Sequence, residues 1–426
     1  MKLTPLEIAG GTPLGMNPDE PALPDVGSLS ALVAFEDVVR AALLRPPCVV
    51  PFSGGRDSAA VLAVAARIAR EENFERPVAV TVRFEGGLGT DEAKWQERVI
   101  AHAHVEDWIR LTVADEIDFI GPLCGPLIQR HGVRHPASLP LFSLPLQYAR
   151  GGSLLTGFGG DSVIGGWLPA HAAEVVGRRA LPRPADFLSF GYALSPRTIR
   201  AAVMRTRLSR PPWMRVRAFK EFNAARVAEL AERPVRRDKF LRWEVRLRRS
   251  AFTEQTLALL GADADARVFN PLHDRRFIAA LARDLGPRGG GDRTSIMRRL
   301  FAKDLPDDVL ARRDKANFAV AYFRSYTRDF ARRWDGVGLD PEIVDADELR
   351  KAVLEWIVDP RAVLALQAAW LSAVERGVEE PIADIVEARG IARPLHDPHR
   401  ESRELEERRR AADLRPAMPR EGNQSL

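Results

Sequence analysis

The stretch CVVPFSGGRDSAAVLAVAARIA, residues 48–69, decides the fold of this chain. Its apolar start, residues 48–52, predicts a strand, and the Ala- and Val-rich run over 58–72 predicts a helix. Between them lie Ser53, Gly54, Gly55, Arg56, Asp57 and Ser58. Glycines let a backbone approach a ligand closely, and N–H groups at a helix start attract anions. This turn is therefore predicted to bind phosphate, with both serines donating to phosphate oxygens.

Asp57 needs an explanation within such a turn, because a bare carboxylate repels phosphate. Magnesium held between Asp57 and phosphate oxygens supplies one. The alternative is a plain tight turn in which Asp57 caps the helix. The GxxxxGK[ST] spacing of a Walker loop is absent. The pattern SGGxDS after an apolar strand instead resembles the pyrophosphate-binding loop of the PP-loop ATP pyrophosphatase superfamily, whose members split ATP between the α and β phosphates.

The flanking sequence alternates between strand and helix patterns. Further strands are expected at 76–84, 107–113 and 153–161, and helices at 28–46, 90–104 (with Thr90 as N-cap) and 139–152. Alternation of this kind predicts a parallel sheet covered on both faces. Ligands bind such sheets beyond the carboxyl ends of the strands. The glycine-rich loops at 53–58 and 157–166 both follow predicted strands, so we expect one site formed by both.

Strand patterns fade after about residue 170, and helical patterns take over. The predicted fold class is therefore α/β, with a parallel-sheet core followed by an α-helical lobe, and the resemblance of the first loop implies that this core is of the PP-loop (adenine nucleotide α-hydrolase-like) type. Residues 1–28 are expected to form a Pro/Gly-rich, extended or partly ordered lead. Residues 29–395 are expected to form the main domain, with the sheet core at about 45–170 and the helical lobe at about 171–395. Residues 396–426 read as a charged, disordered tail.

The second loop, LLTGFGGDSVIGGW at 154–167, supplies five glycines and Asp161. Two acids at two strand ends suit magnesium bound to a triphosphate, whereas a glycine-rich turn capped by Asp161 is the alternative. The pattern TGxGGD…GG resembles the second signature of the asparagine synthase family, which includes β-lactam synthetases and lasso-peptide cyclases. The similarity extends over about 30–390: to 84–104 with Asp91 and Glu92, to 269–281 with Asp274, and to 312–323 with Lys315.

This resemblance implies an ATP-dependent, AMP-forming amide ligase that uses ATP and Mg2+. A substrate carboxylate would attack the α-phosphorus, and an amine would then displace AMP. Lys315, Asp57 and Asp161 are the implied catalytic residues, and the two acids are the implied metal ligands. Lys315 would stabilise developing negative charge, although a solvent-exposed lysine is the alternative. The implied ATP- and pyrophosphate-binding residues are Ser53, Gly54, Gly55, Arg56, Asp57, Ser58, Thr156, Gly157, Gly159 and Gly160.

Several positions depart from the family pattern. Glutamine-dependent members begin with a glutaminase domain whose second residue is a nucleophilic Cys, whereas Lys2 stands here. Nitrogen is therefore expected from free ammonia, a partner glutaminase or an amine on the substrate. Phe158 occupies the place of the asparagine synthase Glu or the β-lactam synthetase Tyr, and Ser162 replaces a common Glu. Phe158 cannot accept a proton, so we expect a more apolar or bulkier substrate, or a base from elsewhere; Glu244 is one candidate.

Composition, charge and cysteine content limit the classes of function that this chain can have. The chain has 426 residues with 63 basic and 58 acidic side chains, a net charge of +5, which is ordinary for a globular protein. Two cysteines, Cys48 and Cys124, make a disulfide scaffold or zinc site unexpected. No run of 18 apolar residues and no secretory signal occur, so a cytoplasmic protein with no membrane partner is expected. The arginine-rich segment 236–249 suits an acidic substrate or, alternatively, a solvated helix face.

Three functions remain open at this point. The first is an amide ligase acting on small-molecule or peptide carboxylates and amines. It would serve peptide or natural-product tailoring (macrolactam or lasso-type cyclisation, with a precursor peptide or partner protein), or act as a stand-alone asparagine synthase-like enzyme. The second is a tRNA-modifying PP-loop enzyme, which the basic charge favours slightly, although a nucleic-acid partner is not expected. The third is a catalytically reduced ATP-binding partner.

Overall fold

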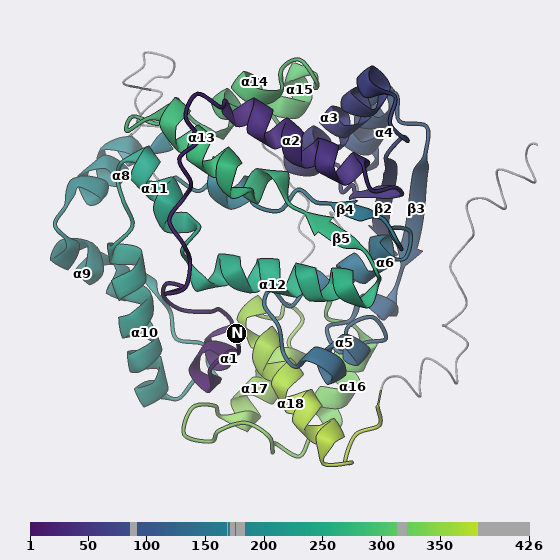
Figure 1. Ribbon diagram of the computed structural model, residues 1–426. Coiled ribbons are helices and arrows are strands. Elements are labelled where there is room, and N and C mark those ends of the chain that lie inside the picture. The colour runs from purple at the N-terminus through teal and green to yellow at the C-terminus, as the bar shows by residue number, and fades with distance from the viewer. Residues whose placement is uncertain (86–91, 168, 171–174, 176–183, 313–321, 382–426) are drawn as a thin grey trace, which may run out of the picture. The chain divides into compact units, whose positions relative to one another are not determined.

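The strands of the chain are β1 (Cys48–Pro51), β2 (Val78–Phe84), β3 (Trp108–Val113), β4 (Ser153–Leu155) and β5 (Arg267–Phe269), which pair in parallel in the order β3-β2-β1-β4-β5 (Figure 1). The computed structural model describes residues 1–85, 92–167, 169–170, 175, 184–312 and 322–381. The chain runs from β1 outward to β3, and then returns to the other side of β1 for β4. The strand order therefore reverses between β1 and β4, which is where ligands bind in open parallel sheets.

The helices of the first half are α1 (Pro5–Gly10), α2 (Ala31–Leu43), α3 (Arg56–Glu72), α4 (Ala93–Ala103), α5 (Gly125–His131), α6 (Ser143–Leu146), α8 (Pro184–Leu194) and α9 (Arg197–Arg207). Those of the second half are α10 (Val216–Ala231), α11 (Arg237–Glu244), α12 (Arg248–Asp263), α13 (Arg275–Leu285), α14 (Arg293–Phe301), α15 (Asp307–Leu310), α16 (Ser325–Arg333), α17 (Ala346–Leu354) and α18 (Val363–Glu375). Short 3-10 helices are η1 (Asp115–Ile117), η2 (Leu139–Phe142), η4 (Pro271–His273) and η6 (Pro360–Ala362), and η3 (Gly160–Ile164) is a π-helical turn.

Helices cover both faces of the sheet, as the alternation predicted. Neighbouring residues of a strand point to opposite faces. Val50 accordingly packs in the core shared with α2, α3 and α13, whereas Val49 packs in the core shared with α6 and α12. Figure 1 shows α2 and α13 on one side of the strands and α12 on the other. The α/β fold with a large helical part is thus confirmed.

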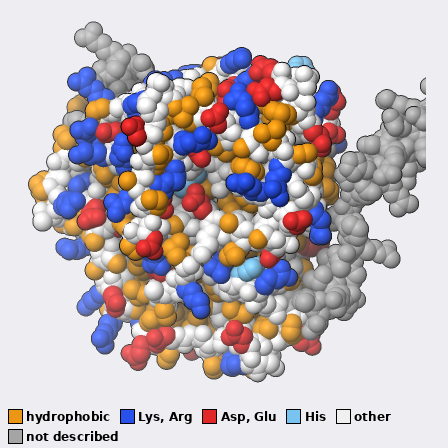
Figure 2. Space-filling model, viewed as in Figure 1, with side chains coloured by type: hydrophobic (Ala, Val, Ile, Leu, Met, Phe, Trp, Pro, Cys, Tyr) orange, Lys and Arg blue, Asp and Glu red, His pale blue; other side chains and the backbone are white. Residues whose placement is uncertain are grey.

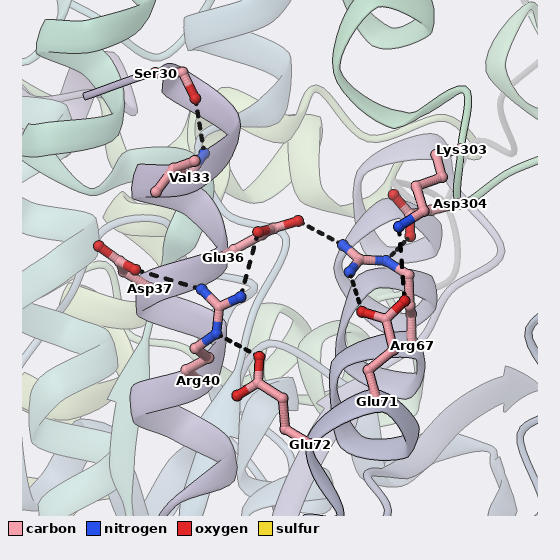
Figure 3. Close-up of polar contacts among 10 residues, drawn as sticks. All are labelled: Ser30, Val33, Glu36, Asp37, Arg40, Arg67, Glu71, Glu72, Lys303 and Asp304. Carbon is pink, nitrogen blue, oxygen red and sulfur yellow. Dashed lines mark hydrogen bonds and ion pairs between the residues drawn. The ribbon is translucent and has the colours of Figure 1, made fainter. Parts of the chain in front are cut away.

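Helix α3 follows β1 directly and is held to α2 by an ion-pair network (Figure 3). Glu36 of α2 bonds Arg67 of α3 at 2.6 Å, and Arg67 also reaches the carboxylate of Asp304 at 2.5 Å. Arg40 of α2 bonds Glu72, the last residue of α3, at 2.7 Å. Asp304 is buried, so these contacts fix α3 and hence the turn at its N-terminus more firmly than exposed pairs would.

Four predictions about secondary structure are wrong in detail. A strand, β5, lies at 267–269, so the sheet is not built from residues 45–170 alone. The lead is not simply extended, because α1 forms at residues 5–10 with a complete capping box between Thr4 and Glu7. Helix α4 begins at Ala93 with Glu92 as N-cap, so it starts later than predicted, and Thr90 lies outside the described residues. The strand predicted at 153–161 ends at Leu155, because the glycine-rich loop turns away from the sheet there.

Residues 1–385 form one compact unit. The predicted tail at 396–426 lies outside the described residues. Within the described part of the chain, no helix combines the length and the apolar character needed to cross a membrane. Basic and acidic side chains are interspersed over the face of the molecule that Figure 2 shows, with hydrophobic side chains scattered among them.

Candidate active site

The two glycine-rich loops meet where the strand order reverses. The first loop leaves β1 and the second leaves β4, its neighbour in the sheet. A Cβ added to Gly157 would lie 3.0 Å from the backbone nitrogen of Ser58, and one on Gly160 would collide with the carboxylate of Asp57. Only glycine at these two positions lets the second loop approach the start of α3 this closely. The predicted convergence of both loops is therefore observed.

The first loop is folded by its own side chains. The Oγ atoms of Ser53 and Ser58 lie 3.2 Å apart, and Ser58 also donates to the carbonyl oxygen of Gly55 at 3.1 Å. Gly54 has a φ of +87°, which favours glycine. Gly55 is the N-cap of α3 and offers no side-chain cap. The first turn of α3 thus presents N–H groups that an anion, and not a capping side chain, is suited to satisfy.

The first loop is also held from outside. Gln96 of α4 donates to the carbonyl of Ser53 at 3.1 Å, and Arg312 donates to the carbonyl of Gly54 at 3.1 Å. Arg312 pairs in turn with Glu92, and both side chains are buried. The guanidinium of Arg312 also lies 4.8 Å from the ring centre of Trp95. Glu92, part of the predicted acidic pair, therefore anchors the backbone of the first loop through Arg312.

The second loop turns sharply after β4. Thr156 donates to the side-chain oxygen of Asn270 at 2.5 Å, and the backbone N–H of Phe158 donates to the Thr156 hydroxyl. Gly159 has a φ of +100°, and residues 160–164 then form the π-helical turn η3. Asp161 lies in the first turn of η3 with 59 % of its side chain exposed. The loop thus projects Asp161 outward, toward the side chain described next.

Arg293 joins the two predicted metal ligands. One of its terminal nitrogens lies 2.7 and 2.6 Å from the two carboxylate oxygens of Asp57, and the other bonds Asp161. Burial lowers the pKa of Arg293, but the charges and hydrogen bonds of Asp57 and Asp161 outweigh that effect and raise it. The sequence reasoning missed Arg293. A signal was present, since an Asp-Arg pair follows three glycines and begins helix α14.

The arginine of the first loop contacts two helices from the second half of the chain. The side chain of Arg56 donates to the hydroxyl of Thr294 at 3.3 Å and to the carbonyl of Leu310 at 3.4 Å. Arg56 therefore ties the loop to α14 and α15 through its side chain. The backbone N–H of Arg56 lies at the start of α3, among the groups predicted to bind an anion.

The other residues singled out from the sequence lie in different surroundings. Lys315 and Asp91 lie outside the described residues. Asp274 caps α13, accepting hydrogen bonds from the N–H groups of Arg276 and Phe277. Glu244 is buried and accepts two hydrogen bonds from Arg249, both at 3.1 Å, so it is engaged as a structural ion pair. Ser162 donates to the carbonyl of Gly159 within the second loop.

The arginine-rich segment 236–249 contacts the backbone of the second loop. Arg237 is fully buried and donates to the carbonyls of Val163 at 2.6 Å and Ile164 at 2.9 Å. Burial, together with the nearby charge of Arg233, lowers the pKa of Arg237 to about 10. Its guanidinium also lies 5.6 Å from the ring centre of Trp167. This arginine thus fixes the end of η3, neither facing solvent nor lying open to an acidic substrate.

Phe158, which departs from the family pattern, lies beside a histidine. The ring centres of Phe158 and His273 are 4.7 Å apart. His273 belongs to η4, directly after β5, and its Nδ1 lies 2.7 Å from a carboxylate oxygen of Glu254 on α12. Sequence reasoning did not single out His273 or Glu254, because both are far from the two loops along the chain.

The arrangement of the two loops and the two acids suits a nucleoside triphosphate with a divalent cation. Asp57 and Asp161 already share one cation, the Arg293 guanidinium, so their oxygens converge on one point. Carboxylate oxygens are the ligands Mg2+ prefers, and Mg2+ takes its other ligands from phosphates and water. Among the described residues, no group of three or more His, Cys, Asp or Glu side chains is arranged to hold a metal by itself. The residues therefore fit Mg2+ that arrives with phosphate.

Comparison with known proteins agrees with this geometry. A search of curated proteins found no match. A family model described as asparagine synthase matches residues 33–382, which include both loops, Arg293 and every strand of the sheet. The members of that family are ATP-dependent ligases. The match covers most of the chain, and the chain therefore belongs to the asparagine synthase family.

Proposed function

We propose that this protein is an AMP-forming amide ligase, which adenylates a substrate carboxylate and transfers the acyl group to an amine. The observation that carries the proposal is the convergence of Asp57 and Asp161 on one cation, between two glycine-rich loops at the reversal of strand order. Phosphate-binding backbone and paired carboxylates at one point suit the cleavage of a triphosphate better than simple storage of a nucleotide.

In this proposal the first loop and the first turn of α3 bind the pyrophosphate part of ATP. The N–H groups there and the hydroxyls of Ser53 and Ser58 donate to phosphate oxygens. Gly157 and Gly160 carry no Cβ, which lets the second loop lie against the start of α3 beside the phosphates. Thr156 and Gly159 shape the second loop around it. Arg293, released from the carboxylates, has two nitrogens that match phosphate oxygens.

Asp57 and Asp161 are the residues that would hold Mg2+. When bound, the ion supplies positive charge that offsets the negative charge of the triphosphate. A carboxylate oxygen of the substrate then attacks the α-phosphorus, and pyrophosphate leaves with the electron pair of the broken P–O bond. We assign Lys315 to stabilise the negative charge that moves through this step, since an ammonium on a flexible stem can follow it.

The second half of the reaction is attack by an amine on the acyl-adenylate, with AMP as leaving group. We propose that the substrates are peptide or natural-product carboxylates and amines, as in macrolactam or lasso-type cyclisation. The aromatic pair of Phe158 and His273 beside the second loop supports this choice, because it suits an apolar or bulky group. A precursor peptide, a partner protein or a separate glutaminase would then deliver a substrate or the nitrogen.

Exchange of labelled pyrophosphate into ATP tests the proposal. The protein is assayed with Mg2+ and a panel of amino acids, short peptides and peptides with internal acidic side chains. Exchange that depends on one of these acids supports adenylation. Normal ATP binding, measured by calorimetry, with no exchange for any acid would leave an ATP-binding partner and overturn the ligase.

A further inference from the structure

His273 carries an unpartnered nitrogen next to the second loop. Its side chain is 4 % exposed, and its Nδ1 lies 2.7 Å from Oε1 of Glu254. The other nitrogen, Nε2, is buried and has no hydrogen-bond partner in the part of the chain that the structure describes. Buried polar atoms are normally hydrogen-bonded, so a buried imidazole nitrogen with no partner indicates a functional role, such as binding a ligand or accepting a proton.

The position of His273 relates it to the reacting centre. A Cβ on Gly159 would lie 2.9 Å from both the Cβ of His273 and the carbonyl oxygen of Leu272. His273 therefore packs directly on the second loop. The next residue of that loop, Gly160, lies against the carboxylate of Asp57. One segment of the second loop thus separates the imidazole from the acids that converge on Arg293.

The partner on Nδ1 fixes the chemistry available on Nε2. A carboxylate only accepts, so the short contact with Glu254 requires a proton on Nδ1. A neutral imidazole with its proton on Nδ1 carries its lone pair on Nε2. A carboxylate on the far nitrogen also orients the ring and stabilises the imidazolium that proton uptake creates. The pair is therefore built to accept a proton at Nε2.

We propose that the Glu254–His273 pair is the proton acceptor for the attacking amine. This inference rests on the proposed function and supplies the base that Phe158 cannot provide. The amine nitrogen forms a bond to the acyl carbon, the bond from that carbon to the phosphate oxygen breaks, and AMP leaves with its electron pair. The proton on the new amide nitrogen passes to Nε2 of His273. Glu254 acts as a positioning residue, since it acts through His273.

Phe158 controls access to this nitrogen in the same proposal. Its ring is half-buried and tilted by 38° against the imidazole, with 4.7 Å between ring centres. An acceptor amine that enters beside the second loop displaces the Phe158 ring and reaches Nε2. Before that, the ring keeps water from the base, which protects an acyl-adenylate from hydrolysis.

Three variants separate the base from a merely structural histidine. H273N keeps a side-chain N–H for Glu254 and removes the accepting nitrogen. E254Q removes the charge that orients the ring, and E254D restores it. H131Q is the matched control, because His131 forms a similar contact of 2.6 Å with Asp263, between α5 and the end of α12. Each variant is checked for unchanged thermal unfolding before its activity is measured.

The experiment compares the two half-reactions with the acid that gives the strongest pyrophosphate exchange. We expect H273N to keep exchange within about 3-fold of wild type, because adenylation needs no amine. Amide formation with an alkylamine, which is protonated at neutral pH, should fall on the order of 100-fold. Hydroxylamine is a much weaker base, so its nitrogen loses the proton more readily after attack, and hydroxamate formation should fall much less. E254Q should show the same pattern more weakly, E254D should recover, and H131Q should match wild type.

Equal losses of exchange, amide and hydroxamate in H273N would make His273 structural and overturn the inference, as would full amide formation. Absence of acid-dependent exchange in the wild type is a different failure, which falls on the proposed function. A substrate-free measurement still judges His273 in that case. Nitrogen NMR of the labelled full chain, assigned with H273N, should show a neutral ring protonated on Nδ1. A proton on Nε2 would overturn the inference.

Discussion

Arg293 bonds both carboxylate oxygens of Asp57, at 2.7 and 2.6 Å, from the first residue of a helix that follows Asp57 by more than 230 residues. The same guanidinium bonds Asp161. Three elements that are distant in sequence, α3, η3 and α14, therefore meet at one charge. In the proposed function, this places a cation beside the two acids assigned to hold Mg2+.

The first prediction concerns Asp57 itself. D57N keeps the size of the side chain and an oxygen for Arg293 but removes the negative charge. Acid-dependent pyrophosphate exchange should fall on the order of 100-fold or more, because the charge holds the cation at the phosphates. D335N serves as control, since Asp335 pairs with Arg376 in the segment that follows α16. Pyrophosphate exchange by D57N at more than a tenth of the wild-type rate would show that Asp57 is not needed at the active site.

The second prediction concerns competition between Arg293 and Mg2+. In R293M the two carboxylates lose their shared cation, so a divalent ion should bind them more readily. The rise in melting temperature caused by Mg2+ alone should therefore be larger in R293M than in wild type. R298M is the matched control, because Arg298 lies on the same helix and pairs with exposed Asp307. An identical rise in melting temperature in R293M and wild type would show that Arg293 and Mg2+ do not compete for the same carboxylates.

The third prediction concerns the buried pair that holds the first loop. R312M removes the guanidinium that pairs with the buried Glu92 carboxylate, which should cost about 3–5 kcal/mol of unfolding free energy. The double variant E92Q/R312M should be less destabilised than the sum of the single variants. R98M breaks the exposed pair with Asp308 and should cost less than about 1 kcal/mol. Urea unfolding measures all four; strict additivity of E92Q and R312M would contradict direct coupling.

The fourth prediction concerns acid stability. Burial, together with the charges of Arg249 and Arg226, lowers the pKa of His135 to about 4. Between that value and the ordinary pKa near 6.5, the unfolded chain binds a proton that the folded chain does not. Stability should therefore fall as the pH drops from about 6.5 to 4, by up to roughly 3 kcal/mol from this group.

The variant H135Q tests this assignment, because glutamine does not titrate. The acid-induced loss of unfolding free energy between pH 7 and pH 4.5 should be smaller in H135Q than in wild type. H102Q is the control, since His102 is exposed at the end of α4 and should leave the slope unchanged. Parallel slopes for H135Q and wild type would show that His135 does not carry the effect.

The parts of the site that lie within one strand–turn–helix unit could be predicted from sequence. SGGRDS is contiguous, and its apolar strand and Ala-rich helix have clear periods, so β1, α3 and the loop between them followed. The second loop followed for the same reason. Strand β5 could not be predicted in this way, because its three residues are too few to show a period and pair only with β4.

The contacts between distant segments could not be predicted. Arg293 and Asp161 are 132 residues apart, and nothing local links them. Glu254 and His273 lie on two elements with β5 between them, so helical spacing does not reveal the pair. For Arg237, both interpretations of the 236–249 segment, an acidic-substrate site and a solvated helix face, were wrong. Arg237 is buried and donates to the carbonyls of Val163 and Ile164, and backbone carbonyls of a distant loop leave no pattern in the sequence.

The most direct test of the central claim is the fate of carboxylate oxygen. The acid that gives the strongest pyrophosphate exchange is labelled with oxygen-18 in its carboxyl group and converted to amide in the presence of ATP and Mg2+. Adenylation transfers one labelled oxygen to the phosphate of AMP, and mass spectrometry should find it there. Label in inorganic phosphate with formation of ADP, or AMP without label, would contradict the account.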